Sequence, residues 1–157
     1  MLGRLLAELA ADAPAVTVDL QPLRDAFEQH IRRDEVDLLL VAEGVCQGRL
    51  DEIAQECLFA DCFMLCAWRH NAALQPDLSI AEFEALPYVQ YGMGHEAGLA
   101  ERSLEWLNIR PKIQLRTESQ LLVPFLLTKS PSVALVPKRL AQLVETRSRP
   151  QGHRATV

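Results

Sequence analysis

The chain has 157 residues and a formal net charge of −5 at pH 7, from 16 lysines and arginines and 21 aspartates and glutamates. Hydrophobic residues make up 49% of it and charged residues 24%, which is typical of one medium-sized globular domain or two small lobes. The acidic balance excludes a surface built mainly to neutralise nucleic-acid phosphates, because such a surface needs clustered lysine and arginine.

The first thirteen residues predict an amphipathic helix. Leucines recur at helical spacing from Leu2 to Leu9, and Pro14 ends the run. The segment weakly resembles a signal peptide, with Arg4 ahead of an apolar stretch, but Glu8 interrupts it and its period is helical. The sequence contains no apolar stretch that predicts a transmembrane span. We therefore expect a cytoplasmic protein.

A strand–helix–strand unit is predicted next. Residues 16–20 alternate between apolar and polar, residues 23–31 have helical spacing, and residues 36–42 are nearly all apolar, as in a parallel strand covered on both faces. Doubly wound α/β domains normally have a strand before their first helix, and this sequence has none. The first half is therefore expected to be an incomplete lobe.

The second half predicts alternating strands and helices. Ser79 and Glu82 have the spacing of a capping box at a helix start. The expected strands are 57–68, 88–91, 112–117 and 132–136, the expected helices follow Ser79 and cover 99–107, 119–129 and 137–145, and 92–98 is a glycine-rich loop. This alternation predicts a mostly parallel sheet. We expect a first lobe over 1–55, a second over 56–145 and a disordered tail over 146–157.

The four cysteines, Cys46, Cys57, Cys62 and Cys66, form no C-x-x-C pair and are expected to be buried small hydrophobes in a reducing compartment. A metal site from Cys62, Cys66 and His70 is the alternative. The strand predicted there would hold the two cysteines about 13 Å apart, too far for one zinc ion. We predict no metal and no cofactor.

Ligand sites of parallel sheets lie beyond the carboxyl ends of the strands. The expected ligand-binding residues are Glu43, Val45, Tyr91, Met93, His95, Glu118, Ser119 and Gln120, which follow three predicted strands. Free N–H groups at a helix start near Ser119 would favour an anionic group such as a carboxylate. The alternatives are a plain loop role for His95, a helix cap for Ser119 and a solvated turn for Glu43. Of Tyr88 and Tyr91, one is expected to line the site and the other to pack.

No catalytic set emerges from the sequence. It has no G-x-S-x-G, H-E-x-x-H or phosphate-loop motif, and Gly92, Gly94 and Gly98 fail the G-x-G-x-x-G spacing of dinucleotide sites. The four histidines are scattered along the chain. We predict that the chain is not an enzyme.

An ordered set of stretches resembles the effector-binding domain of LysR-type transcriptional regulators, in the branch of nodulation regulators and other aromatic-responsive activators. These stretches are Glu35–Leu40, Leu58–Leu65, Leu86–Val89, Thr117–Ser119 and Val133–Ala141, the last being the most specific. The resemblance spans roughly residues 2 to 145. The family's N-terminal winged helix-turn-helix and linker helix have no counterpart here.

The resemblance implies an α/β fold of the type II periplasmic-binding-protein kind, with two Rossmann-like lobes of which the first is incomplete. It implies a small-molecule effector, aromatic or carboxylated, bound between the lobes of a homo-oligomer, with no DNA contact by this chain itself and no membrane. One alternative is a structural or oligomerisation module that has lost ligand and DNA binding, because open sheet edges invite pairing. An enzyme or solute-binding protein of the same fold is another.

Overall fold

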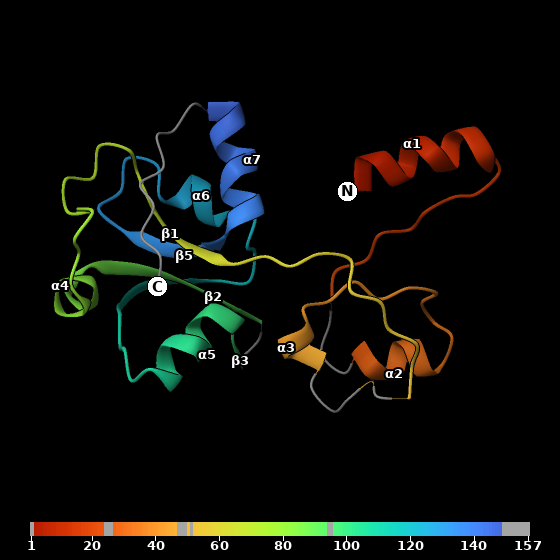
Figure 1. Cartoon of the computed structure of the whole chain (residues 1–157), viewed down its shortest axis with the longest axis horizontal. Coiled ribbons are helices and arrows are strands. Elements are labelled where there is room, and N and C mark those ends of the chain that lie inside the picture. The colour runs from red at the N-terminus through yellow and green to blue at the C-terminus, as the bar shows by residue number, and fades with distance from the viewer. Residues whose placement is uncertain (1, 24–26, 47–49, 51, 94–95, 149–157) are drawn as a thin grey trace. The chain divides into compact units, whose positions relative to one another are not determined.

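Figure 1 shows the computed structural model, which describes residues 2–23, 27–46, 50, 52–93 and 96–148. The chain divides into two compact units, Met1–Leu40 (unit 1) and Val41–Val157 (unit 2). The lobe boundary near residues 50 to 56 stays a prediction. Of the predicted tail, residues 146–148 are helical and the rest lies outside the described residues.

The described residues of unit 1 include two helices, α1 (Leu2–Asp12) and α2 (Phe27–Arg32). Both were predicted, although α2 is described only from Phe27. The Nε of Arg4 donates to Glu8 Oε1 at 2.8 Å across one turn of α1. A turn follows α2, in which Asp34 has a left-handed φ of 55°.

The two strands predicted for the first half are wrong. Residues 16–20 and 36–42 are irregular apart from a bend, and their apolar side chains are largely exposed, with Leu20 at 74% and Leu38 at 88%. A strand is stable only when its backbone pairs with neighbours and a layer covers it, and two strands alone are marginal in water. Among the described residues, the ladders join only strands of unit 2.

Unit 2 carries the sheet. Its elements in chain order are α3 (Glu43–Cys46), β1 (Phe63–Ala67), α4 (Ile80–Ala85), β2 (Pro87–Met93), β3 (Glu96–Ala97), α5 (Leu99–Trp106), β4 (Lys112–Thr117), α6 (Val123–Leu126), β5 (Val133–Pro137) and α7 (Lys138–Ser148). The predicted capping box is confirmed: the Ser79 side chain accepts from the N–H of Glu82, and the Glu82 carboxylate accepts from the N–H of Ser79.

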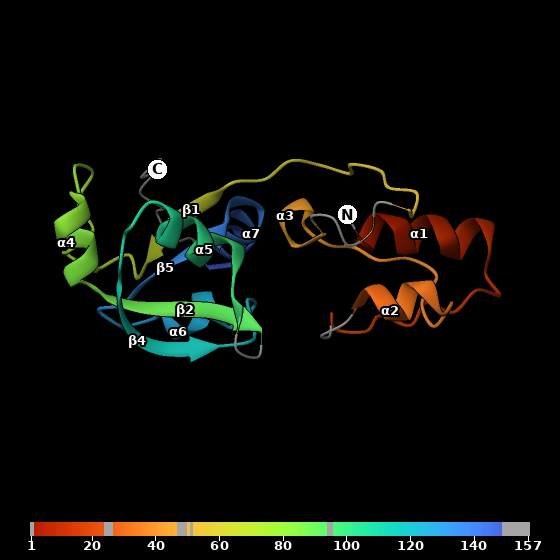
Figure 2. The ribbon, with the colours of Figure 1, turned by 90° about the horizontal axis from the view of Figure 1, so that it is seen from below.

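The sheet is mixed. β2 is parallel to β4 and to β5, whereas β1 is antiparallel to β5 and β3 is antiparallel to the end of β2. Figure 2 shows β2 and β4 running side by side. The expectation of a mostly parallel sheet is therefore wrong in part, because β1 enters against β5 and because residues 92–98, expected to be a loop, include the β2–β3 hairpin.

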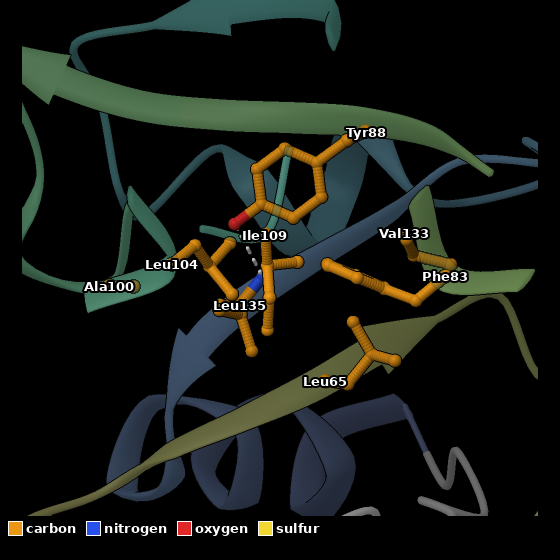
Figure 3. Close-up of a cluster of buried hydrophobic side chains, with 8 residues drawn as sticks. All are labelled: Leu65, Phe83, Tyr88, Ala100, Leu104, Ile109, Val133 and Leu135. Atoms are coloured by element: carbon orange, nitrogen blue, oxygen red, sulfur yellow. Dashed lines mark hydrogen bonds between the residues drawn. The ribbon is translucent and has the colours of Figure 1, made fainter. Parts of the chain in front are cut away.

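Hydrophobic side chains form two clusters on opposite faces of the sheet. Alternate residues of β5 belong to different clusters, as the period of a strand requires: Val133 and Leu135 join one, Ala134 and Val136 the other. The first cluster includes side chains from α4 and α5 and is drawn in Figure 3; the second includes side chains from α6 and α7.

Two of the stretches that carry the family resemblance contact each other. The Asp61 carboxylate accepts the N–H of Arg139 at 3.3 Å, and the carbonyl oxygen of Cys62 accepts the N–H of Lys138 at 2.8 Å. The guanidinium of Arg139 lies 4.3 Å from the centroid of the Phe59 ring. The segment before β1 therefore caps the start of α7, 78 residues further along the chain.

Candidate functional site

The carboxyl ends of β2 and β4 lie together at one edge of the sheet. Tyr91 lies opposite Thr117 in the parallel ladder. Met93 ends β2, and residues 118–120 follow β4 directly. Five of the eight predicted ligand residues, Tyr91, Met93, Glu118, Ser119 and Gln120, are therefore gathered at what we call the β2–β4 edge.

The two tyrosines of β2 have different environments. Tyr88 is fully buried and packs in the first hydrophobic cluster, where its ring meets the Phe83 ring edge to face at 5.9 Å (Figure 3). Tyr91 is half-buried at the β2–β4 edge. The pKa of the Tyr91 hydroxyl is raised, first by burial and then by the carboxyl groups of Glu101 and Glu118. Tyr88 is thus the tyrosine that packs in the core, whereas a ligand role for Tyr91 stays a prediction.

Sequence reasoning missed Glu101, a buried carboxyl group beneath this edge. It is only 5% exposed, and its Oε1 accepts hydrogen bonds from the Tyr88 hydroxyl at 2.9 Å and from the N–H of Tyr91 at 3.2 Å. The Tyr88 hydroxyl in turn accepts the N–H of Leu135 at 3.3 Å, drawn as the dashed line in Figure 3. One polar network therefore connects α5, β2 and β5.

Burial raises the pKa of the Glu101 carboxyl, although its hydrogen bonds act in the opposite direction. The sequence held a signal for this residue: Glu101 lies one helical turn before Leu104 and therefore on the apolar face of α5. A lone carboxylate on such a face is a mark of a buried polar group.

The helix expected from Ser119 to about Lys129 is much shorter. Helix α6 begins only at Val123, and Leu122 rather than Ser119 is its N-cap. Pro124 explains the difference, because it has no N–H to donate to the carbonyl of Gln120 and its ring would clash there in a longer helix. The N–H of Ser119 is bonded to the Thr117 hydroxyl, and α6 does not begin at Ser119, so the helix start expected there is wrong.

Glu43 and Val45 belong to the short helix α3, which adjoins the start of α5. Nη2 of Arg102 donates to the carbonyl oxygen of Gly44 at 3.2 Å, and a Cβ at Gly44 would lie 2.9 Å from Leu99. The start of α5 also meets β2, because the N–H of Gly98 donates to the carbonyl oxygen of Tyr91 at 3.0 Å. Helix α3 and the end of β2 thus both contact the same part of α5, with Glu43 exposed and Val45 half-buried.

The remaining expectations concern His95, the cysteines and a metal site. His95 lies outside the described residues. Cys57 and Cys62 are exposed, because they precede β1 in an uncovered segment, and Cys66 is half-buried, so burial of the cysteines is wrong for the first two. Within the described ranges, no group of three or more His, Cys, Asp or Glu residues could hold a metal ion, and no helix is long and apolar enough to cross a bilayer.

Comparison with known proteins finds a matching family, curated relatives and solved structures. The family described as LysR substrate binding domain matches residues 1–149. Nodulation protein D 2 of Bradyrhizobium sp. (strain NC92) is 26% identical over 144 residues, which cover 90% of this chain and 42% of that protein. Nodulation protein D 1 of Bradyrhizobium japonicum is 28% identical over 142 residues, which cover 88% and 42%. The chain thus spans less than half the length of these relatives.

A solved structure shows the same fold. The regulatory domain of MexT, a transcriptional activator in Pseudomonas aeruginosa, superposes with a TM-score of 0.66 over 94% of this chain and 70% of that chain, at 16% identity. The predicted α/β fold of the type II periplasmic-binding-protein kind is confirmed. The match over residues 1–149 places the chain in the LysR substrate-binding domain family.

Proposed function

We propose that this chain is the effector-sensing part of a LysR-type transcriptional regulator and binds a small aromatic effector at the β2–β4 edge. The pairing of Tyr91 with Thr117 carries the proposal, because it brings the half-buried tyrosine next to residues 118–120. Open α/β sheets bind ligands at the carboxyl ends of their strands.

The side chains at this edge suit an aromatic ligand. Met93 is half-buried, and Leu121 and Leu122, which follow the predicted ligand residues, are 67% and 51% exposed. Small-molecule sites combine such apolar walls with a few polar groups, here the side chains of Ser119 and Gln120. Val45 and Glu43 on α3, and His95, are proposed to complete the site.

Sensing follows from a difference in affinity. An effector shifts a regulator between two conformations only by as much as it binds one of them more tightly. We propose that the effector changes the arrangement of the two lobes and thereby of a homo-oligomer that works in the cytoplasm, with DNA contacted by other parts of the regulator and no reaction catalysed here.

Thermal unfolding with a panel of small aromatic compounds tests the site. A ligand at about 100 times its Kd stabilises by about 2.7 kcal/mol, which raises Tm by roughly 5 to 11 °C for a chain of this size. We expect Tyr91→Ala to abolish the shift and Trp106→Ala, at a side chain 90% exposed on α5, to leave it intact. A panel without any shift would contradict the proposal.

An oligomerisation module is the second candidate, supported by the surface of β4 and α6. Residues 112–116 of β4 are all exposed, including Ile113 and Leu115, and Phe125 on α6 is 66% exposed. Within the described part of the chain, β4 pairs only with β2, so the backbone groups along the other side of β4 have no neighbouring strand. Open edges pair with other strands. Light scattering that shows a monomer at high concentration would count against this candidate.

A further inference from the structure

We infer that Arg102 is a positioning residue of the proposed effector site: its guanidinium fastens α3 to the start of α5 and thereby sets where Glu43 and Val45 lie relative to the β2–β4 edge. The inference rests on the proposed function, which counts Glu43 and Val45 among the ligand residues, and it adds the side chain that holds them in place. Contacts of the start of α5 with β2 and with α3 support it.

The start of α5 is fixed on the end of β2. The N–H of Gly98, the N-cap of α5, donates to the carbonyl oxygen of Tyr91 at 3.0 Å. The carboxyl group of Glu101 accepts the N–H of the same Tyr91 at 3.2 Å and the Tyr88 hydroxyl at 2.9 Å. Both backbone groups of Tyr91 are therefore bonded to the first turn of α5, so this turn has a defined place beside the β2–β4 edge.

The same turn of α5 carries α3. Nη2 of Arg102 donates to the carbonyl oxygen of Gly44 at 3.2 Å, across 58 residues of sequence. A Cβ at Gly44 would lie 2.9 Å from Cδ2 of Leu99, so the backbone of Gly44 lies directly against that side chain. Glu101 and Arg102 are consecutive residues of a helix, and their side chains point in different directions. One of them holds α5 to β2, and the other holds α3 to α5.

Helix α3 needs a partner from outside. It has only four residues, Glu43–Cys46, and the last four carbonyl groups of any α-helix lack a partner within that helix. Short helices are also marginal in water without tertiary contacts. A hydrogen bond from a guanidinium is stronger than one between neutral groups. Arg102 therefore supplies a bond that α3 cannot make by itself.

The position of α3 in the chain gives this bond a consequence for sensing. Unit 1 ends at Leu40, and α3 is the first element of unit 2, beginning at Glu43. Fastening α3 to α5 therefore fixes the chain where it enters unit 2. An effector that contacts both α3 and the β2–β4 edge would favour the fastened arrangement, because its affinity is higher when the two are held together.

Hydrogen exchange tests the fastening without any ligand. Millisecond exchange of residues 41–46 in the whole chain should be about three- to tenfold faster in Arg102→Ala than in the parent, since one charged hydrogen bond is lost. Tm should change by less than about 2 °C, because Arg102 is exposed and alanine is a better helix former. Arg110→Ala, which removes another exposed arginine of unit 2, is the matched control and should leave the exchange of residues 41–46 unchanged.

Titration calorimetry with benzyl alcohol, a neutral aromatic probe, tests the consequence for binding. Arg102→Ala should bind it about threefold more weakly or worse, and Arg110→Ala as tightly as the parent. Exchange of residues 41–46 that is the same in Arg102→Ala and the parent overturns the inference, and so does unchanged affinity in that variant. If the parent itself does not bind benzyl alcohol, the proposed aromatic site is contradicted, and the exchange result still decides whether Arg102 fastens α3.

Discussion

Removing the hydroxyl of Tyr88 tests the network that connects α5, β2 and β5. In Tyr88→Phe the ring stays in the first hydrophobic cluster, so packing changes by one oxygen atom. The substitution leaves the N–H of Leu135 without its acceptor at 3.3 Å and removes the donor at 2.9 Å from Glu101 Oε1. Both groups are buried, so water cannot replace the lost partner.

The expected cost follows from these two losses. A buried N–H without an acceptor costs about 1 to 3 kcal/mol, and the lost hydrogen bond to the Glu101 carboxyl adds about 1 kcal/mol. We therefore expect Tyr88→Phe to lower the free energy of unfolding by about 2 to 4 kcal/mol, equivalent to a Tm lower by roughly 5 to 15 °C.

Urea unfolding followed by circular dichroism measures this change. Tyr91→Phe is the matched control, because it removes a half-buried hydroxyl that lies outside the network and should cost less than about 0.5 kcal/mol. Double substitution with Glu101→Gln should be clearly non-additive, since the two residues share a hydrogen bond. A stability of Tyr88→Phe within about 0.5 kcal/mol of the parent would refute the reasoning.

Three further predictions concern α5 and its N-cap, with control substitutions at exposed positions. Gly98→Ala should lower the free energy of unfolding by about 1 to 3 kcal/mol, because the added Cβ would lie 2.6 Å from Glu101 Oε2. Gly3→Ala, where a Cβ would have nothing within 4 Å, should stabilise α1 by up to about 1 kcal/mol, and urea unfolding of both variants measures the difference. Because the pKa of the Glu101 carboxyl is raised, its protonated form stabilises the fold fully below about pH 4.5, and this stabilisation is lost as pH rises through the raised pKa. Glu101→Gln should therefore reduce the fall of Tm with pH, and parallel pH profiles of Tm for the variant and the parent would contradict this. Leu104→Ala, at a side chain 4% exposed, should cost about 2 to 5 kcal/mol in denaturant unfolding, and Trp106→Ala, 90% exposed, less than about 0.5.

Local signals predicted several elements of the second half of the chain, although the strand expected over 57–68 is confined to β1. The capping box at Ser79 and the alternating run 112–117 each act within a few residues, so their effect is readable without knowledge of the rest of the fold. The edge formed by Tyr91 and residues 118–120 depends instead on the pairing of β2 with β4, which are distant in the sequence, and its role as a ligand site stays a prediction.

Long-range requirements explain the errors. Residues 36–42 have the composition of a buried strand, yet composition does not supply the neighbouring strands that would pair with it. Glu101 was missed because its role depends on Tyr88, thirteen residues away, and on the N–H of Leu135 beyond it. The predicted helix at Ser119 failed for a local reason that was visible, the proline at position 124.

The pairing of β1 with β5 has a consequence for synthesis on the ribosome. Phe63 lies opposite Pro137, and the only ladder of β1 in the described residues is with β5. At about 5 to 20 residues per second, the nascent β1 waits several seconds for its partner to be translated. During that interval the side chain of Leu65, which is buried in the folded protein, has no partner strand to cover it. A chaperone can bind this strand in that interval.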